Sequence, residues 1–190
     1  MVTRERRYTL DDLRRIESLP ENAGKTFELI DGDLYGAPTP NAIHNFIVSQ
    51  ILYALMNFVF PRQLGFVLGD QTAHSLPNGD ELIPDASFVS FQRQPSLPER
   101  FSITPDIAVE VISPSNRERD VTAKVESYLE SGTALVWLFY PISRVVEVWR
   151  RAEDGAPKFR KLTEDALLDG EDVLPGFTLA LRDVFPVEAP

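Results

Sequence analysis

The sequence contains no cysteine and only two histidines. Without cysteine the chain forms neither disulfides nor thiolate metal sites, and two histidines are too few for the usual zinc-binding runs. A glycine-rich phosphate loop and the nucleophile elbow of serine hydrolases are also missing. These absences leave the oxygen atoms of aspartate and glutamate as the candidate metal ligands.

Long hydrophobic runs are missing too. The most apolar segment, residues 47–60, is interrupted by Ser49, Gln50 and Asn57 and is too short to span a bilayer. Residues 1–7 contain no apolar core of the kind found in signal peptides. We therefore expect a cytoplasmic protein that does not contact a membrane.

Positive charge is scarce: 19 Lys and Arg face 29 Asp and Glu, for a formal net charge of −10. Nucleic-acid-binding proteins usually present a basic face, because Lys and Arg displace counterions from phosphates. The basic residues here form only local clusters, which in most proteins are solvated surface. If the protein binds nucleic acid, we expect its affinity to be weak or to depend on a metal ion or a partner.

The length and composition favour one domain. With 190 residues, 43% of them hydrophobic, the chain is long enough for one sizeable core and short for two. Internal repeats, low-complexity tracts and linkers are absent from the sequence. We expect a single domain over residues 1–190, with its core at about residues 8–185.

Helix and strand patterns alternate along the chain. Thr9 and Asp12 form a capping pattern for a short helix, and Asp31-Gly32 is a hairpin turn between strands at residues 26–30 and 34–35. A long helix ending near Pro61 has a predicted sheet-facing stripe of Ile43, Phe46, Ile47, Ile51, Ala54, Leu55 and Phe58. Further strands are predicted at residues 65–68, 71–76, 86–90, 107–112, 134–139, 145–149 and 175–181, with a helix at 117–131.

The strand predicted at residues 107–112 contains a glutamate, Glu110, in an otherwise apolar run. Such a run is typical of a central strand buried on both faces, and alternation places Glu110 on the face of Ala108 and Ile112. An ionised carboxylate buried there costs several kcal/mol unless a cation, a metal or strong donors lie close by. Glu110 is therefore a candidate functional residue, and the alternative is a structural salt bridge.

Two residues of complementary chemistry accompany it. Asp85 begins the strand at 86–90, and Lys124 borders the apolar stripe of the helix at 117–131, from where it can lean toward the sheet. In the simpler alternatives, Pro84-Asp85 is an ordinary turn and Lys124 pairs with Asp120 one helical turn earlier. Two carboxylates and a lysine are also the groups that hold a divalent cation against a phosphodiester and activate water.

These residues resemble the PD-(D/E)XK motif of the restriction-endonuclease-like superfamily. Over roughly residues 8–185 the chain resembles the Uma-type endonucleases, a bacterial family of unknown function, at residues 27–32 (Phe-Glu-Leu-Ile-Asp-Gly), His44, Pro84-Asp85, 110–115 (Glu-Val-Ile-Ser-Pro-Ser) and 135–138 (Leu-Val-Trp-Leu). The 110–115 block is the most specific. The usual motif has lysine two residues after the glutamate, where this chain has Ile112, and Lys124 matches the migrated lysine of some members.

The resemblance implies an α/β fold with a mixed central β-sheet flanked by α-helices, plus an extra N-terminal helix and β-hairpin. It implies a metal-dependent endonuclease that hydrolyses nucleic-acid phosphodiester bonds, with DNA as the expected substrate. Asp85 and Glu110 are then the ligands of Mg²⁺ or Mn²⁺, ions that favour oxygen ligands. The implied catalytic residues are Asp85, Glu110, Lys124 and Glu28, and the implied substrate-binding residues are Ser113, Ser115 and His44.

Several alternatives stay open. Glu28 could be a half-exposed structural acid, and His44 a hydrogen-bonding residue at a helix start. The chain could be a catalytically degenerate relative that binds DNA or protein, or a hydrolase of another phosphoester. We also expect a homodimer, because Trp137, Phe139 and Trp149 need cover and because enzymes that cut both strands of a duplex commonly work as C2 dimers.

Overall fold

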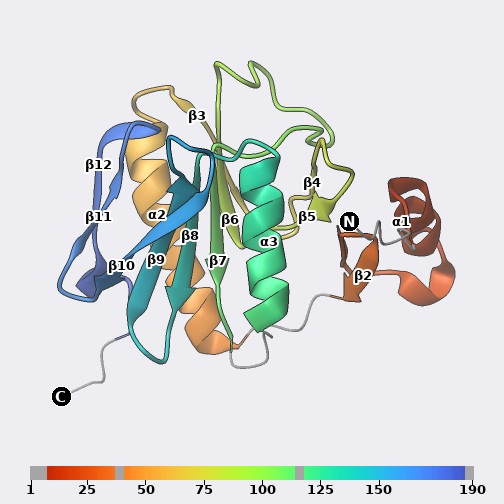
Figure 1. Cartoon of the computed structure of the whole chain (residues 1–190), viewed down its shortest axis with the longest axis horizontal. Helices are drawn as coiled ribbons and strands as arrows, with labels where there is room; N and C mark the ends of the chain where they lie inside the picture. Colours follow the sequence, from red (N-terminus) through yellow and green to blue (C-terminus); the bar gives the residue numbers. More distant parts are fainter. Residues whose placement is uncertain (1–7, 37–40, 114–117, 187–190) are drawn as a thin grey trace.

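The computed structural model describes residues 8–36, 41–113 and 118–186, and its centre is a six-stranded sheet (Figure 1). The strand order is β10-β9-β8-β7-β6-β3. β7 and β8 are parallel and the other neighbouring pairs are antiparallel, so the sheet is mixed. The strands are β3 (Gly65–Gly69), β6 (Ala86–Ser90), β7 (Ile107–Val111), β8 (Leu135–Tyr140), β9 (Val145–Arg151) and β10 (Pro157–Thr163).

A helix covers each face of this sheet: α3 (Glu118–Glu130) lies in front of it in Figure 1 and α2 (Ala42–Val59) behind it. On the α2 side the core includes Ile47, Ile51, Leu55, Ile107, Val109 and Val111. On the α3 side it includes Ala108, Val125, Tyr128, Leu129, Val136 and Leu138. The predicted alternation of β7 is therefore confirmed, and the predicted mixed α/β fold with it.

Smaller elements lie at both sides of the central sheet. The predicted N-terminal helix is α1 (Leu10–Glu17), begun by a capping box of Thr9 and Asp12. The predicted hairpin, β1 (Phe27–Ile30) and β2 (Asp33–Gly36), joins β5 (Glu81–Leu82) and β4 (His74–Ser75) in a second sheet. At the opposite side, β11 (Leu167–Gly170) and β12 (Leu174–Ala180) pack beside α2. Two short 3₁₀ helices, Pro20–Asn22 and Leu181–Asp183, complete the described elements.

Three predicted details of the fold were wrong. The sheet-facing side of α2 is rotated: Ile43 and Phe46 are exposed, and Val48 and Val59 are in the core instead. Apolar residues occur all round this helix, so periodicity could not define one face. The strand predicted over 71–76 is only the two-residue β4, and β10 and β11 were not predicted at all. β10 is a largely exposed edge strand without a regular apolar alternation.

Of the three aromatic side chains that were expected to need a partner chain, two are buried within the molecule and Trp149 is partly buried. Trp137 and Phe139 are fully buried. Trp137 stacks on Phe177 of β12, with ring centroids 5.8 Å apart, and Trp149 stacks on Phe159 of β10 at 4.3 Å. This reason for expecting a homodimer was therefore wrong.

Candidate active site

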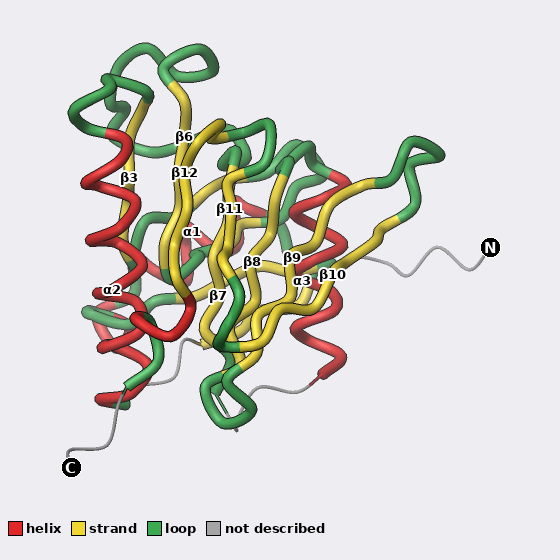
Figure 2. The backbone as a smooth tube through the Cα atoms, turned by 90° about the vertical axis from the view of Figure 1, so that its left-hand side faces the viewer, coloured by secondary structure: helices red, strands yellow, loops and turns green. Residues whose placement is uncertain are grey.

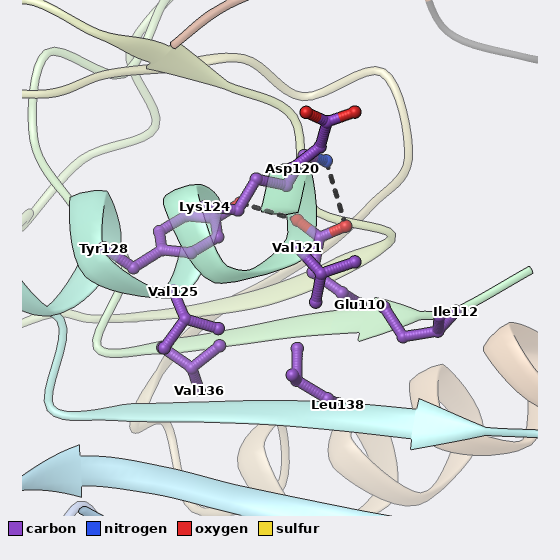
Figure 3. A pocket seen from close by; sticks show the side chains of 9 residues that line it. All are labelled: Glu110, Ile112, Asp120, Val121, Lys124, Val125, Tyr128, Val136 and Leu138. Atoms are coloured by element: carbon purple, nitrogen blue, oxygen red, sulfur yellow. Dashed lines mark hydrogen bonds and ion pairs between the residues drawn. The ribbon is translucent and has the colours of Figure 1, made fainter. Parts of the chain in front are cut away.

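Glu110 is buried on the face of β7 that α3 covers (Figure 3). Lys124 and Tyr128 lie four residues apart on α3, so both reach the same carboxylate. The Lys124 Nζ atom lies 3.1 Å from Glu110 Oε2, and the Tyr128 hydroxyl donates a hydrogen bond of 3.0 Å to Glu110 Oε1. The predicted approach of Lys124 to Glu110 is confirmed. In the part of the chain that the structure describes, Lys124 forms no ion pair with Asp120, the simpler alternative.

Glu28 reaches the same lysine from the second sheet. Its Oε2 atom lies 2.8 Å from Lys124 Nζ, and its Oε1 atom accepts a 2.8 Å hydrogen bond from the backbone N–H of Ile83. Glu28 is buried, not half-exposed, because β1 packs against α3. One ammonium group thus bridges carboxylates from two different sheets.

Asp85 is held beside the end of β7 by backbone contacts. Its N–H donates to Val109 O at 3.0 Å, and its Oδ2 atom accepts the N–H of Val111 at 2.6 Å. The same oxygen lies 3.2 Å from His44 Nε2. His44 arrives from the first turn of α2, where the Asn41 side chain caps the helix by accepting the His44 N–H at 2.9 Å. His44 therefore contacts a predicted metal ligand.

The electrostatics of the cluster reflect an excess of negative charge. Burial raises the pKa of Glu110 to about 8; Lys124 opposes this shift, and Asp85 and Glu28 add to it. Burial disfavours the charged form of Lys124, but Glu110 and Glu28 outweigh burial and raise the pKa of Lys124. The hydrogen bond to Asp85 raises the pKa of His44 above its ordinary value. The neighbouring carboxylates therefore favour the protonated form of all three groups, and burial is the larger cause for Glu110.

The donor set suits a hard cation with few protein ligands. Within the described residues, no group of three or more His, Asp or Glu is arranged to hold a metal ion. Mg²⁺ usually keeps several waters and takes only one or two carboxylates together with substrate phosphate. Asp85 and Glu110 offer that number of oxygen ligands, and a cation there would offset the charge that raises the pKa of Glu110. The residues present fit Mg²⁺ or Mn²⁺ and not a closed zinc site.

A small cavity of about 30 Å³ opens beside this cluster (Figure 3). Glu110, Lys124 and Asp120 supply polar groups to its lining, and Val121 and Leu138 supply apolar ones. A cavity of this size holds a water molecule, which needs polar partners to remain there. Space for water therefore lies next to the lysine and the carboxylate.

The two predicted serines are placed differently. Ser113 follows β7 by two residues and is partly buried near the same strand end. Ser115 lies outside the described residues. The structure thus brings together Glu28, His44, Asp85, Glu110 and Lys124 through the contacts given above.

Tyr128 is the residue of the cluster that sequence reasoning missed. It was assigned only to the apolar stripe of its helix, yet its hydroxyl orients Glu110. A buried tyrosine hydroxyl usually has a hydrogen-bond partner, and Tyr128 lies one turn after Lys124. The position of Tyr128 in the apolar stripe, one turn after Lys124, could therefore have indicated from the sequence that its hydroxyl reaches Glu110.

We expect Tyr128→Phe to lower stability by about 1 to 2 kcal/mol, because one buried oxygen of Glu110 loses its donor. For a chain of this length the melting temperature should fall by roughly 2–8 °C. The matched control is Tyr140→Phe, whose hydroxyl donates at 3.3 Å to Glu147, outside the cluster. Calorimetry showing the same small change for both variants would contradict a positioning role for Tyr128.

The mixed sheet with a helix on each face, and the lysine–carboxylate cluster at the end of a central strand, define a restriction-endonuclease-like protein. The family model Uma2, described as "Putative restriction endonuclease", matches residues 10–182. The chain therefore belongs to the Uma2 family.

One solved structure shows the same fold. It is a crystal structure of a "putative nuclease belonging to DUF820" from Anabaena variabilis ATCC 29413, with a TM-score of 0.81 and 24% sequence identity. The match covers 94% of this chain and 97% of that one. No curated protein matches the chain. The description of the family suggests a nuclease, and the solved structure shows the fold that the two proteins share.

Proposed function

We propose that the protein is a cytoplasmic, metal-dependent endonuclease that hydrolyses phosphodiester bonds in DNA. The observation that carries this proposal is the convergence of Asp85, Glu110 and Lys124 at the end of β7 and the start of β6. Burying acids beside one another is costly. A relative that only binds DNA or protein would have no need to maintain this arrangement, so the convergence favours an enzyme.

Asp85 and Glu110 would hold Mg²⁺ or Mn²⁺. When bound, such a cation supplies Lewis-acid polarisation of the scissile phosphate and lowers the pKa of water. Lys124 contributes a fixed positive charge that orients the attacking water or stabilises the charge that develops on phosphorus. The remaining side chains act by position: Glu28 fixes the Lys124 ammonium and His44 fixes Asp85.

The net charge of −10 bears on how such an enzyme meets its substrate. An acidic chain gains little from counterion release, which supplies most non-specific DNA affinity. The proposed enzyme therefore binds DNA weakly without a divalent cation, and its affinity rises when the cation offsets the carboxylates.

A cleavage assay tests the proposal. Wild-type protein is incubated with single-stranded, duplex and branched DNA, and with single-stranded RNA, in Mg²⁺, Mn²⁺ or a chelator. We expect metal-dependent cleavage of DNA, and a loss of roughly a hundredfold or more in Glu110→Ala, because cation and lysine lose their shared partner. The control is Glu126→Ala, an exposed glutamate of the same helix, which should cleave like wild type.

Two outcomes would contradict the proposal. Equal cleavage by Glu110→Ala and wild type would show that the activity arises elsewhere. Absence of cleavage on every substrate, with DNA bound in the presence of metal, would instead support the binding-module alternative. Cleavage of RNA alone would support metal-dependent phosphodiester hydrolysis but would show that the substrate is RNA and not DNA.

A further inference from the structure

One face of α2 is exposed and uncharged, with aromatic side chains among polar ones such as Ser49 and Asn57. The helix lies at the outer surface of the molecule, with the central sheet on its other side (Figure 2). None of its 18 residues is Asp, Glu, Lys or Arg. By length and composition it could cross a membrane, but its buried face packs in the core of the protein.

The exposed face carries three aromatic side chains at heptad spacing, which we call the aromatic stripe: Phe46, Tyr53 and the C-cap residue Phe60. Their exposed fractions are 41%, 68% and 52%. Residues seven apart drift by only about 20° around a helix, so the three side chains line up. Three aligned exposed aromatics in an acidic protein mark an interaction surface rather than scattered surface residues.

We propose that the aromatic stripe pairs with the aromatic stripe of a second copy of this chain, antiparallel and about a two-fold axis at Tyr53. The stripe reads the same in both directions, because Phe46 and Phe60 each lie seven residues from Tyr53. A two-fold interface must be self-complementary in this way. Tyr53 then meets Tyr53 of the second copy, and Phe46 meets Phe60.

The charge distribution favours a second copy over other occupants. Two molecules of net charge −10 repel each other, and α2 offers a face without formal charge where they can approach. Nucleic acid and anionic lipid surfaces are usually bound through Lys and Arg, which the helix lacks.

The surface formed by the aromatic stripe continues beyond the C-terminal end of α2. Phe60 borders a groove lined also by Gln63, Gly65, Phe66 and Phe91, at the edge strand β3. An 18-residue helix is only about 27 Å long, so the interface is at the small end of specific interfaces even with this extension. The pairing is therefore weak, with dissociation in the micromolar range.

The absence of cysteine allows a direct test by disulfide crosslinking. Under mild oxidation Tyr53→Cys should form a covalent dimer. Phe46→Cys mixed with Phe60→Cys should give the heterodimer, while neither should crosslink by itself, because like positions are then about 21 Å apart and a disulfide needs roughly 4–7 Å between Cα atoms. The control is Ile142→Cys, 83% exposed on the β8–β9 turn, which should stay monomeric.

Sedimentation gives an independent measurement. The mass of wild type and of Ile142→Glu should rise toward that of a dimer between about 1 and 100 µM, and Tyr53→Glu should stay monomeric. Crosslinking of Tyr53→Cys no greater than that of Ile142→Cys would overturn the proposal, as would self-crosslinking of Phe46→Cys, which requires a parallel pair. Monomeric wild type that binds phosphatidylcholine vesicles through the stripe would also overturn it. None of these readouts depends on nuclease activity.

Discussion

Glu110→Gln is expected to abolish metal-dependent cleavage while leaving the metal-free fold as stable as wild type or more stable, by on the order of 1 kcal/mol. The reason is the raised pKa of Glu110, about 8, which means that a neutral side chain already suits this position near neutral pH. A glutamine oxygen still accepts the hydrogen bond of Tyr128, and Lys124 keeps its ion pair with Glu28. What glutamine removes is the charged oxygen that a cation needs.

The same variant should change how stability depends on pH. A carboxyl whose pKa is higher in the folded state stabilises that state when protonated, so this contribution is fully present below the ordinary pKa of 4.5 and is lost as pH rises through about 8. Relative to Glu110→Gln, wild type should therefore lose stability between about pH 4.5 and 8. Denaturant unfolding of both proteins across this range measures the difference.

Added Mn²⁺ completes this comparison. It should raise the melting temperature of wild type by mass action on the folded state and should not raise that of Glu110→Gln. The result that would sink the interpretation is a strongly destabilised Glu110→Gln without metal. Glu110 would then be a partner in a structural ion pair, and the nuclease assignment would lose its central residue.

At pH 8 and above, where Glu110 is ionised, Lys124→Met is expected to destabilise the protein by about 3 to 5 kcal/mol, because it removes the cation from two buried carboxylates. The melting temperature should fall by roughly 6–20 °C. The loss should be larger at pH 8 than at pH 5, since Glu110, whose pKa burial raises to about 8, is protonated at pH 5 and then needs no cation. Thermal unfolding at both pH values checks the magnitude and its direction.

A second-site variant and a control variant complete the Lys124→Met experiment. Glu28→Gln, added to Lys124→Met, should recover part of the lost stability because one uncompensated charge disappears. Lys161→Met removes an exposed lysine that lies 3.6 Å from Glu147, and such surface pairs contribute about 1 kcal/mol or less. Equal melting temperatures for Lys124→Met and Lys161→Met would mean that the ion pairs of Lys124 carry no stability.

The sequence predicted those parts of the fold that have a distinct local pattern. β7 is a continuous apolar run, and Thr9 with Asp12 is a specific helix-capping pair, so both could be identified from the sequence. β10 could not, because an exposed edge strand is stabilised by its partner strand and not by an apolar face of its own. The buried side of α2 depends on how the helix docks, which its sequence does not specify because apolar residues occur all round the helix.

In the candidate site, too, local sequence patterns predict some contacts and not others. Lys124 could be directed to Glu110 from helix periodicity and strand alternation alone, because both are local. The contact of His44 with Asp85 depends on where the start of α2 meets the start of β6, 41 positions later in the chain (85 − 44), and no local pattern encodes it. Tyr128 was overlooked because its apolar ring accounted for its position in the stripe and its hydroxyl was left without a role.

Glu28 belongs to the N-terminal hairpin, whereas Lys124 and Glu110 belong to the central layers of the fold. The hairpin cannot lift away from α3 without exposing its own carboxylate to water and leaving Lys124 with Glu110 alone. Opening of the hairpin and proton binding at the site are therefore coupled, so that each changes the equilibrium of the other. Amide hydrogen exchange along β1, which records such opening, therefore also reports on the charge of Lys124 and Glu110, which lie outside the hairpin.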